Sequence, residues 1–370
     1  MTPLGWVEVV AGVAIVLATF YDLFHSVVLP RPSINRFVLV RFLFRGLWGL
    51  WRWIGGRIRT PATRESWLAV FGPAGVILIF VLWAVAFLLG YALVLDGFRS
   101  QIRPPLAGIG DSLYFSATTI VPLSYGDFVP EGWAPRLTII FESATGVGIA
   151  ALVITLLFSL YQSFQEREEL VVTLDALAGA PPSGLQILER AAADRGLRPE
   201  LVKTFDDWRK WSAAVLESHL AYPILVYFRS SHDNEAWLNS FGAVMDAATL
   251  TYTTLDEDEV GSAKLMLTVG DHLVEDLAWY LRYARSTDPH VDREEFDEAY
   301  ARLKAAGFKC RPVEQAWSDF SRFRAKYAAQ LSQMAHFLAI PEAEWIGDRS
   351  YVPHADGRGG HVQRRKKTPV

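Results

Sequence analysis

Cysteine is almost absent from this sequence, and several signatures of enzymes are absent as well. Cys310 is the only cysteine in 370 residues, which excludes an intrachain disulfide and a cysteine-based zinc cluster. We therefore expect the parts of the chain that lie in water to be intracellular. The sequence has no nucleophile–base arrangement, phosphate loop or glycine-rich nucleotide fingerprint. It predicts that the protein is not an enzyme and holds no metal or cofactor.

Charge is absent from long stretches of the amino-terminal half. Residues 66–95 contain no charged residue over 30 positions, and residues 137–165 contain only Glu142. Residues 4–29 contain only Glu8, Asp22 and His25 among ionisable residues, and they lack a basic start and a cleavage site. Each stretch is long enough to cross a bilayer as a helix. We predict an N-terminal transmembrane helix in 1–30, an outer helix in 66–96 and an inner helix in 136–165.

Two ionisable residues of the first predicted helix are separated by three positions. Asp22 and His25 therefore lie on one helical face, within reach of a hydrogen bond. Ionisable residues inside a membrane are candidates for function. The simpler interpretation is a polar contact that packs this helix against a neighbour near the cytoplasmic interface.

Arginine is concentrated in the segment 31–65, which we expect to be an interfacial linker. It contains eight arginines, from Arg31 to Arg64, and Glu65 is its only acidic residue. The positive-inside rule places such a connection in the cytoplasm, so the N-terminus would lie outside and the C-terminal domain inside. The spacing suits a helix on anionic lipid and does not match the regular repeat of a voltage sensor.

A polar and aromatic segment, Asp111 to Pro130, separates the second and third apolar stretches. It is too short to cross a bilayer, so we predict a re-entrant loop with its backbone buried in protein or lining water. Asp111 is expected to cap a short helix that runs through Thr118 and Thr119, because its carboxylate can accept a free first-turn N–H.

Residues of this loop resemble the pore module of potassium channels, whose pattern is roughly F-S-x-T-T-x-T-T-V-G-Y-G-D. The residues that match in register are Phe115, Ser116, Thr118, Thr119, Tyr125, Gly126 and Asp127. The resemblance implies a pore helix and filter within 111–128, a homotetramer around one axis, and potassium or another monovalent cation as the permeant ion. It also implies a multi-pass protein of the bacterial inner membrane.

The filter departs from that pattern at three consecutive residues. Pro122 replaces a threonine and supplies neither a hydroxyl nor an N–H, while Leu123 replaces a valine. Ser124 replaces a glycine whose backbone conformation serine adopts with difficulty. We expect a cation channel with weakened potassium selectivity. The alternative is a non-conducting pseudo-channel that acts as a scaffold or sensor through its cytoplasmic domain.

The predicted inner helix contains three further candidate residues. By the resemblance, Gly146 falls where pore-lining helices often have a hinge, and Gly148 follows two residues later. Glycine inside a helix lowers helix stability by about 1 kcal/mol relative to alanine, so a packing or bending role is expected. Glu142 either hydrogen-bonds the back of the pore helix or faces the cavity and attracts cations.

The remainder has the composition of a water-soluble helical domain. We expect residues 166–345 to be almost entirely helical, with helices near 182–194, 198–220, 234–254, 257–285, 292–306 and 313–339. The segment Pro223 to Phe228 could be one strand or an extended link. The basic tail 346–370 is expected to be disordered. The fold class is thus an all-α membrane protein with a potassium-channel-like pore and a helical cytoplasmic domain. No nucleic-acid partner is expected, and no gating ligand is evident.

Overall fold

A computed structural model shows the fold of the chain. It describes residues 2–28, 39–178, 182–193, 198–230, 236–256, 260–283, 288–341 and Trp345. Part of the arginine-rich linker, including Arg31 and Arg36, and the tail expected to be disordered lie outside these residues.

The chain divides into two compact units. Unit 1 comprises Met1–Glu169 and Trp211–Asp233, and unit 2 comprises Leu170–Lys210 and Asn234–Val370. The division lies close to the boundary expected at residue 166. It differs in that 23 residues of the C-terminal half, 211–233, return to unit 1. Each unit is therefore described separately.

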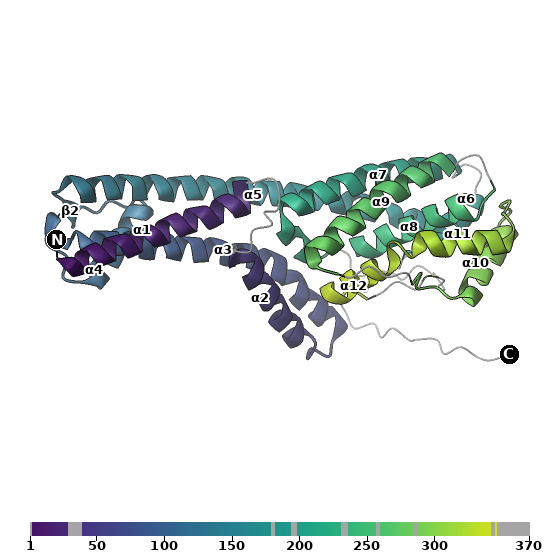
Figure 1. The fold of residues 1–370 in the computed structure, drawn as a ribbon, viewed down its shortest axis with the longest axis horizontal. Helices are drawn as coiled ribbons and strands as arrows, with labels where there is room; N and C mark the ends of the chain where they lie inside the picture. The colour runs from purple at the N-terminus through teal and green to yellow at the C-terminus, as the bar shows by residue number, and fades with distance from the viewer. Residues whose placement is uncertain are drawn as a thin grey trace. The chain divides into compact units, whose positions relative to one another are not determined.

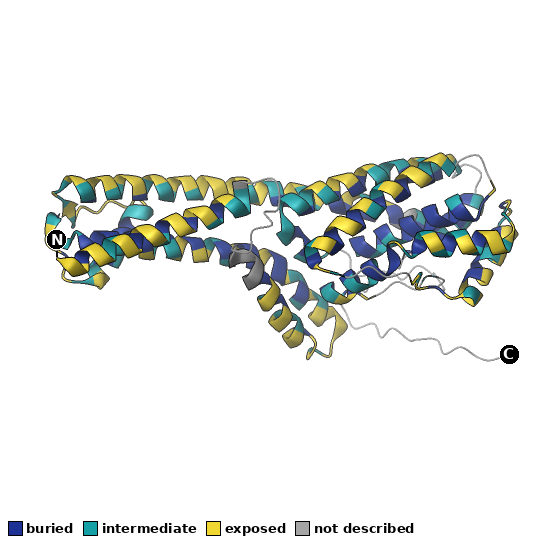
Figure 2. Ribbon diagram, in the orientation of Figure 1, coloured by how far each residue is buried: buried dark blue, intermediate teal, exposed yellow. Residues whose placement is uncertain are grey.

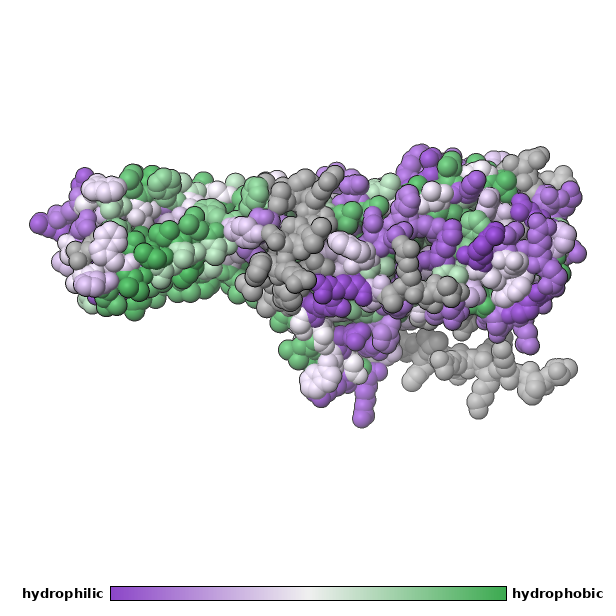
Figure 3. All heavy atoms as spheres, viewed as in Figure 1, coloured by the Kyte–Doolittle hydropathy of each residue, from purple (hydrophilic) through white to green (hydrophobic). Residues whose placement is uncertain are grey.

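Unit 1 contains the helices that are long and apolar enough to cross a membrane. They are α1 (Pro3–Leu23), which continues as a π-helical turn (Phe24–Val28), α3 (Pro61–Gly97) and α5 (Trp133–Ala178), whose residues from Leu170 onward belong to unit 2. These helices overlap the stretches in which spans are expected, although α3 begins earlier and α5 ends later than predicted. The outward side chains of α1 and α5 are exposed (Figure 2) and largely apolar (Figure 3), as expected for surfaces that meet lipid or other chains.

The first and second spans pack closely through small residues. A side chain at Gly12 would collide with the Gly90 carbonyl oxygen, and a methyl group at Gly5 would lie 3.1 Å from the Gly97 carbonyl oxygen. Small residues allow two helix backbones to approach this closely within a membrane. Helix α1 is therefore fitted to α3 along most of its length (Figure 1).

Helix α4 (Ile109–Ile120) is the short helix expected between the second and third spans. On its N-terminal side the chain forms a strand β1 (Ile102–Arg103), which pairs antiparallel with β2 (Val129–Pro130) beyond the loop. No strand pair is expected here from the sequence. It joins the two ends of the loop, while Leu95, Ile102, Leu106 and Phe115 form a small core beneath it.

Unit 2 is helical, as expected, and is built around α8 (Trp237–Thr253). Its other helices are α6 (Gly184–Ala193), the first half of α7 (Arg198–Ala221), α9 (Val260–Leu281), α10 (Arg293–Ala305), α11 (Val313–Arg324) and α12 (Ala328–Leu338). Helices α6, α9, α11 and α12 all contact α8, whose residues are mostly buried. The single helix predicted for 313–339 is wrong, because the chain turns at residues 325–327 between α11 and α12.

The segment Pro223 to Phe228, predicted as a strand or link, is instead mostly a 3-10 helix, η3 (Pro223–Tyr227). It belongs to unit 1. Pro223, which has no N–H, occupies the first position, where a helix does not need a donor. Leu225 N donates to Tyr222 O at 3.0 Å within the turn. The apolar side chains that suggested a strand are instead packed against the membrane helices.

Candidate functional site

The helix expected before the filter is α4, and the expected filter residues follow its C-terminal end. Leu123 N and Ser124 N both donate to Thr118 O, at 2.8 and 3.4 Å. In a trans peptide the N–H and the preceding C=O point in opposite directions. The carbonyl groups of Pro122 and Leu123 therefore point away from α4.

The filter backbone alternates in handedness. Ser124 and Gly126 have positive φ angles of 51° and 80°. In a regular strand successive carbonyls point to opposite sides, whereas a change of φ sign at every second residue turns them toward one side. Ser124 thus adopts the left-handed conformation expected from its position, at a cost of about 1–3 kcal/mol. The geometry can present a row of carbonyl oxygens to a cation.

The filter side chains are poorly covered by their own chain. Tyr125 is 67% exposed and Leu123 is 50% exposed. A cavity of about 430 Å³ lies between the filter, α4 and α5, and its lining includes Thr119, Asp127 and Ser143. Exposed aromatic and apolar groups beside an open cavity are typical of a surface that another chain covers.

Asp111 does not cap α4 in the expected way. It lies inside the first turn, and its Oδ2 accepts a hydrogen bond from Ala107 N at 2.8 Å, upstream of the helix. The N-cap position is occupied by Gly108. Asp111 therefore fastens the incoming chain to the helix, and its charge still lies near the positive helix end.

Of the two alternatives for Glu142, the structure places this side chain against the pore helix. Glu142 is fully buried, and its Oε1 accepts a hydrogen bond from Ser116 Oγ. Gly146 lies against the C-terminal end of α4, where a methyl group would collide with Ile120 O. Gly148 has open space around it, and α5 continues as a helix through both glycines. Gly146 thus permits close packing at this point.

Asp22 and His25 have different hydrogen-bond partners. Asp22 Oδ2 accepts from Trp83 Nε1 of α3 at 2.8 Å, and His25 Nδ1 lies 2.8 Å from Tyr21 O of its own helix. Their contacts fix α1 against α3 and order the end of α1. The structure supports the simpler interpretation of a helix-packing contact.

A buried arginine near the C-terminal end of α5 was not among the residues expected from the sequence. Arg167 is 2% exposed, and its guanidinium donates to Leu225 O at 3.1 Å and Phe228 O at 2.7 Å. It also forms an ion pair with Glu168 at 2.9 Å, while Trp211 Nε1 donates to Arg167 O at 2.9 Å. The sequence shows an arginine followed by two acidic residues at the end of an apolar helix. This pattern is also found wherever a helix leaves the membrane, so it did not identify Arg167 as a buried residue.

His219 lies in the same cluster. Its Nδ1 lies 2.8 Å from Val215 O, and the side chain is buried. Burial, and secondly the positive charge of Arg167, lower the pKa of His219 to about 3, while the contact with Val215 O opposes this. His219 is therefore neutral in the folded protein near pH 7.

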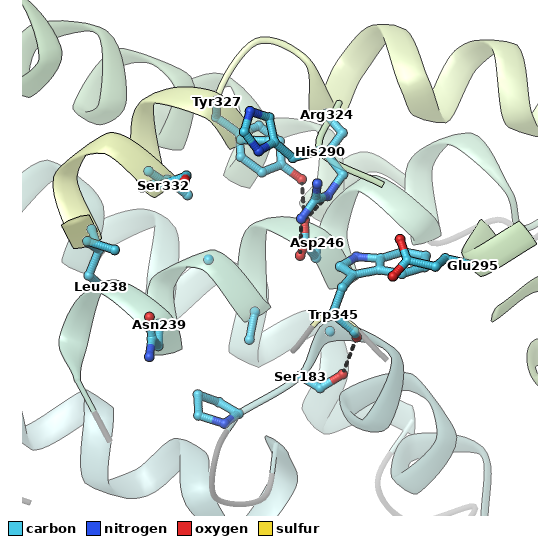
Figure 4. A pocket seen from close by; sticks show the side chains of 17 residues that line it. Ser183, Leu238, Asn239, Asp246, His290, Glu295, Arg324, Tyr327, Ser332 and Trp345 are labelled. Atoms are coloured by element: carbon cyan, nitrogen blue, oxygen red, sulfur yellow. Dashed lines mark hydrogen bonds and ion pairs between the residues drawn. The ribbon is translucent and has the colours of Figure 1, made fainter. Parts of the chain in front are cut away.

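Unit 2 contains a polar cavity of about 230 Å³ to which the sequence analysis assigned no residue (Figure 4). At its edge Arg324 pairs with Asp246 through contacts of 2.9 and 3.2 Å, and Tyr327 donates to Asp246 at 2.8 Å. Burial, together with the charge of Asp246, raises the pKa of Tyr327 well above its usual value. The paired charges give the cavity a rigid edge with little net charge, and its volume is below the range typical of ligand pockets, about 300–1,000 Å³.

Comparisons with known proteins give an ion-channel family match that lies within unit 1. Residues 75–163 match a family model described as "Ion channel". The chain is 23% identical over 232 residues to "Uncharacterized membrane protein YdjJ" of Bacillus subtilis (strain 168). This similarity covers 57% of the chain and 65% of that relative, less than two thirds of its length. No solved structure matches the chain with significance. Residues 75–163 therefore form a domain of the two-transmembrane, potassium-channel-like ion channel family.

Proposed function

We propose that four copies of this chain form a cation channel in the bacterial inner membrane. The observation that carries the proposal is the filter backbone, in which the carbonyls of Pro122 and Leu123 point away from α4. One chain supplies only one side of such a site, so several copies must surround an axis to replace the hydration shell of an ion. The exposed Tyr125 and the cavity beside it are consistent with coverage by a neighbouring copy. Transport would be passive, and the chain would not be an enzyme.

The proposed orientation places the N-terminus outside and unit 2 in the cytoplasm. Helix α2 (Leu39–Gly55), which carries Arg45 and Arg52, would lie on the cytoplasmic interface against anionic lipid. Trp51 and Trp67 support this placement, because their stacked rings and reciprocal N–H···O=C hydrogen bonds of 3.0 and 3.2 Å fix α2 to the start of α3. Tryptophan is enriched at membrane interfaces.

The proposed channel separates potassium from sodium less well than the family pattern does. Pro122 supplies no hydroxyl for the innermost ion site, and Ser124 is held in a left-handed conformation. Tyr125, Gly126 and Asp127 retain the outer part of the pattern and an acidic mouth that disfavours anions. Because about 1.4 kcal/mol changes a ratio tenfold, one altered site is sufficient for a measurable effect.

The test is the reversal potential of the full chain in liposomes under bi-ionic potassium and sodium, beside the double variant Pro122→Thr and Ser124→Gly. We expect weak discrimination in the unmodified protein and a larger potassium preference in the double variant. Ser100→Gly, at an exposed serine outside the filter, is the matched control and should behave as the unmodified protein.

Three outcomes would contradict parts of this proposal. Strong potassium selectivity in the unmodified channel would refute the argument from Pro122 and Ser124. Absence of any flux from a correctly assembled oligomer would instead favour a non-conducting scaffold. A native mass of one or two chains in mild detergent would exclude the tetramer.

A further inference from the structure

Two serines on one face of the pore helix α4 are each bound by a buried carboxylate from a neighbouring span. Ser112 and Ser116 are four residues apart and fully buried. Ser112 Oγ donates to Asp96 Oδ1 of α3 at 2.8 Å, and Ser116 Oγ contacts Glu142 of α5. Both ends of this face are therefore fixed by polar contacts from different helices.

The contact at Ser112 continues to the N-terminal helix α1. Asp96 Oδ2 accepts a hydrogen bond from Arg99 Nη2 at 2.9 Å, and Arg99 Nε donates to Asp96 O at 3.0 Å. The same Nη2 lies 3.1 and 3.2 Å from the two carboxylate oxygens of Glu8, on α1. Glu8, Arg99, Asp96 and Ser112 form a continuous series of contacts, which we call the Glu8–Ser112 chain.

Asp96 needs its partners because it is only 4% exposed. A buried carboxylate is costly unless charge and hydrogen bonds compensate it. Arg99 supplies the charge, and Ser112 supplies a hydrogen bond from the pore helix. Glu8 in turn fixes the position of Arg99. Close packing of Gly5 against Gly97 fixes this part of α1 against α3, so the backbone at Glu8 is held in place.

The opposite end of α4 holds the filter. Thr118 O accepts the N–H groups of Leu123 and Ser124, as described above. A helix of 12 residues is a stiff rod of about 18 Å. A displacement of its first turn at Ser112 is therefore transmitted to Thr118 and to the carbonyl groups that the filter presents.

We propose that α1 is part of the ion-selecting machinery, with Asp96 and Ser112 as positioning residues for the filter and with Glu8 acting on them through Arg99. The inference rests on the proposed function, since it concerns the selectivity of the same pore. It assigns to the additional N-terminal helix a role in setting filter geometry, besides its role in anchoring the chain.

The experiment compares Ser112→Ala, Glu8→Gln and their double variant in the full chain, reconstituted in liposomes under bi-ionic potassium and sodium. Loss of a hydrogen bond to a charged group should lower the already small potassium-to-sodium permeability ratio toward one in Ser112→Ala, by up to about threefold. Ser112→Thr keeps the hydroxyl and should restore the ratio. Ser66→Ala is the control, since Ser66 Oγ donates to Ala62 O of its own helix.

The double variant tests whether the two residues act through one series of contacts. If they do, it should lower the ratio no further than Ser112→Ala does, whereas independent effects multiply. Multiplying effects, or an unchanged ratio in a conducting Ser112→Ala channel, would overturn the inference.

Hydrogen exchange of the filter segment in the same full-length proteins provides a readout that does not depend on conduction. Exchange at Leu123 and Ser124 should be faster in Glu8→Gln than in the unmodified protein, and unchanged in Ser66→Ala. Absence of flux in the unmodified protein would refute the channel but leave this measurement decisive for the contacts. Equal exchange in Glu8→Gln and the unmodified protein would refute the role of α1.

Discussion

Replacing Arg167 with methionine should release the segment around η3 from the membrane helices. The guanidinium bonds to Leu225 O and Phe228 O and pairs with Glu168, all within unit 1. Methionine has a similar length and fills much of the same space, but it donates no hydrogen bond. The change therefore removes the polar contacts of Arg167 while leaving most of the packing in place.

The expected magnitude follows from the burial of these groups. Glu168 is 7% exposed, so its carboxylate would lose the ion pair with Arg167 in a site that water reaches poorly. Breaking a buried ion pair by removing one member costs about 3–5 kcal/mol. Part of that cost should appear as easier opening of residues 222–230, which the arginine ties to α5. A decrease of about 3 kcal/mol in the opening free energy raises exchange roughly 100-fold.

Hydrogen exchange of the full chain in detergent measures this opening directly. The useful amides are those of Leu225 and Phe228, which donate to Tyr222 O and Leu225 O, both at 3.0 Å. The matched control is Arg322→Met, because Arg322 pairs with Asp319 at an exposed surface. Exposed pairs contribute about 0–1 kcal/mol, so exchange in residues 222–230 should not change in the control.

The double variant Arg167→Met with Glu168→Gln tests the cause. Removing both charges should recover part of the protection that the single variant loses, because no carboxylate remains buried without its partner. Unchanged exchange at Leu225 and Phe228 in Arg167→Met would refute the argument that Arg167 holds this segment.

Three further outcomes are expected. Below pH 6.5 the His219 side chain binds a proton in the unfolded state but stays neutral in the folded state, because its folded pKa is about 3. The free energy of unfolding should therefore fall by about 2 kcal/mol from pH 7 to 5. His219→Gln should reduce this fall, measured by thermal unfolding. Gly146→Ala should lower the melting temperature of unit 1 because its methyl group meets Ile120 O, whereas Gly148→Ala, in open space, should not lower it. Gly12→Leu should separate α1 from α3, detected as faster proteolysis of α1 in detergent micelles.

Features governed by local sequence could be predicted. The membrane spans follow from uncharged apolar stretches, and the short helix between the second and third follows from its length. The left-handed backbone at Ser124 could be predicted because Tyr125 and Gly126 set its register within a known pattern. Such features depend on a few adjacent residues and on the solvent around them.

Contacts between distant residues could not be predicted in the same way. Asp22 was paired with His25 by helical spacing, but it binds Trp83, 61 residues away. Helical periodicity also left both orientations of Glu142 open, and only its contact with Ser116 distinguishes them. Arg167 donates to backbone carbonyl groups. Every residue has such a group, so the identity of the side chains could not reveal which residues Arg167 contacts.

The return of residues 211–233 to unit 1 limits how this gene could be cut or recombined. Unit 2 is made from two separate pieces of sequence, 170–210 and 234–370. A break after Glu169 would remove Trp211, Leu225 and Phe228 from unit 1, where they are buried. Unit 1 therefore cannot be exchanged as one continuous segment of sequence. A replacement of unit 2 would have to preserve the three points at which the chain passes between the units, at 169/170, 210/211 and 233/234. A shortened unit 1 would need other side chains in place of Trp211, Leu225 and Phe228.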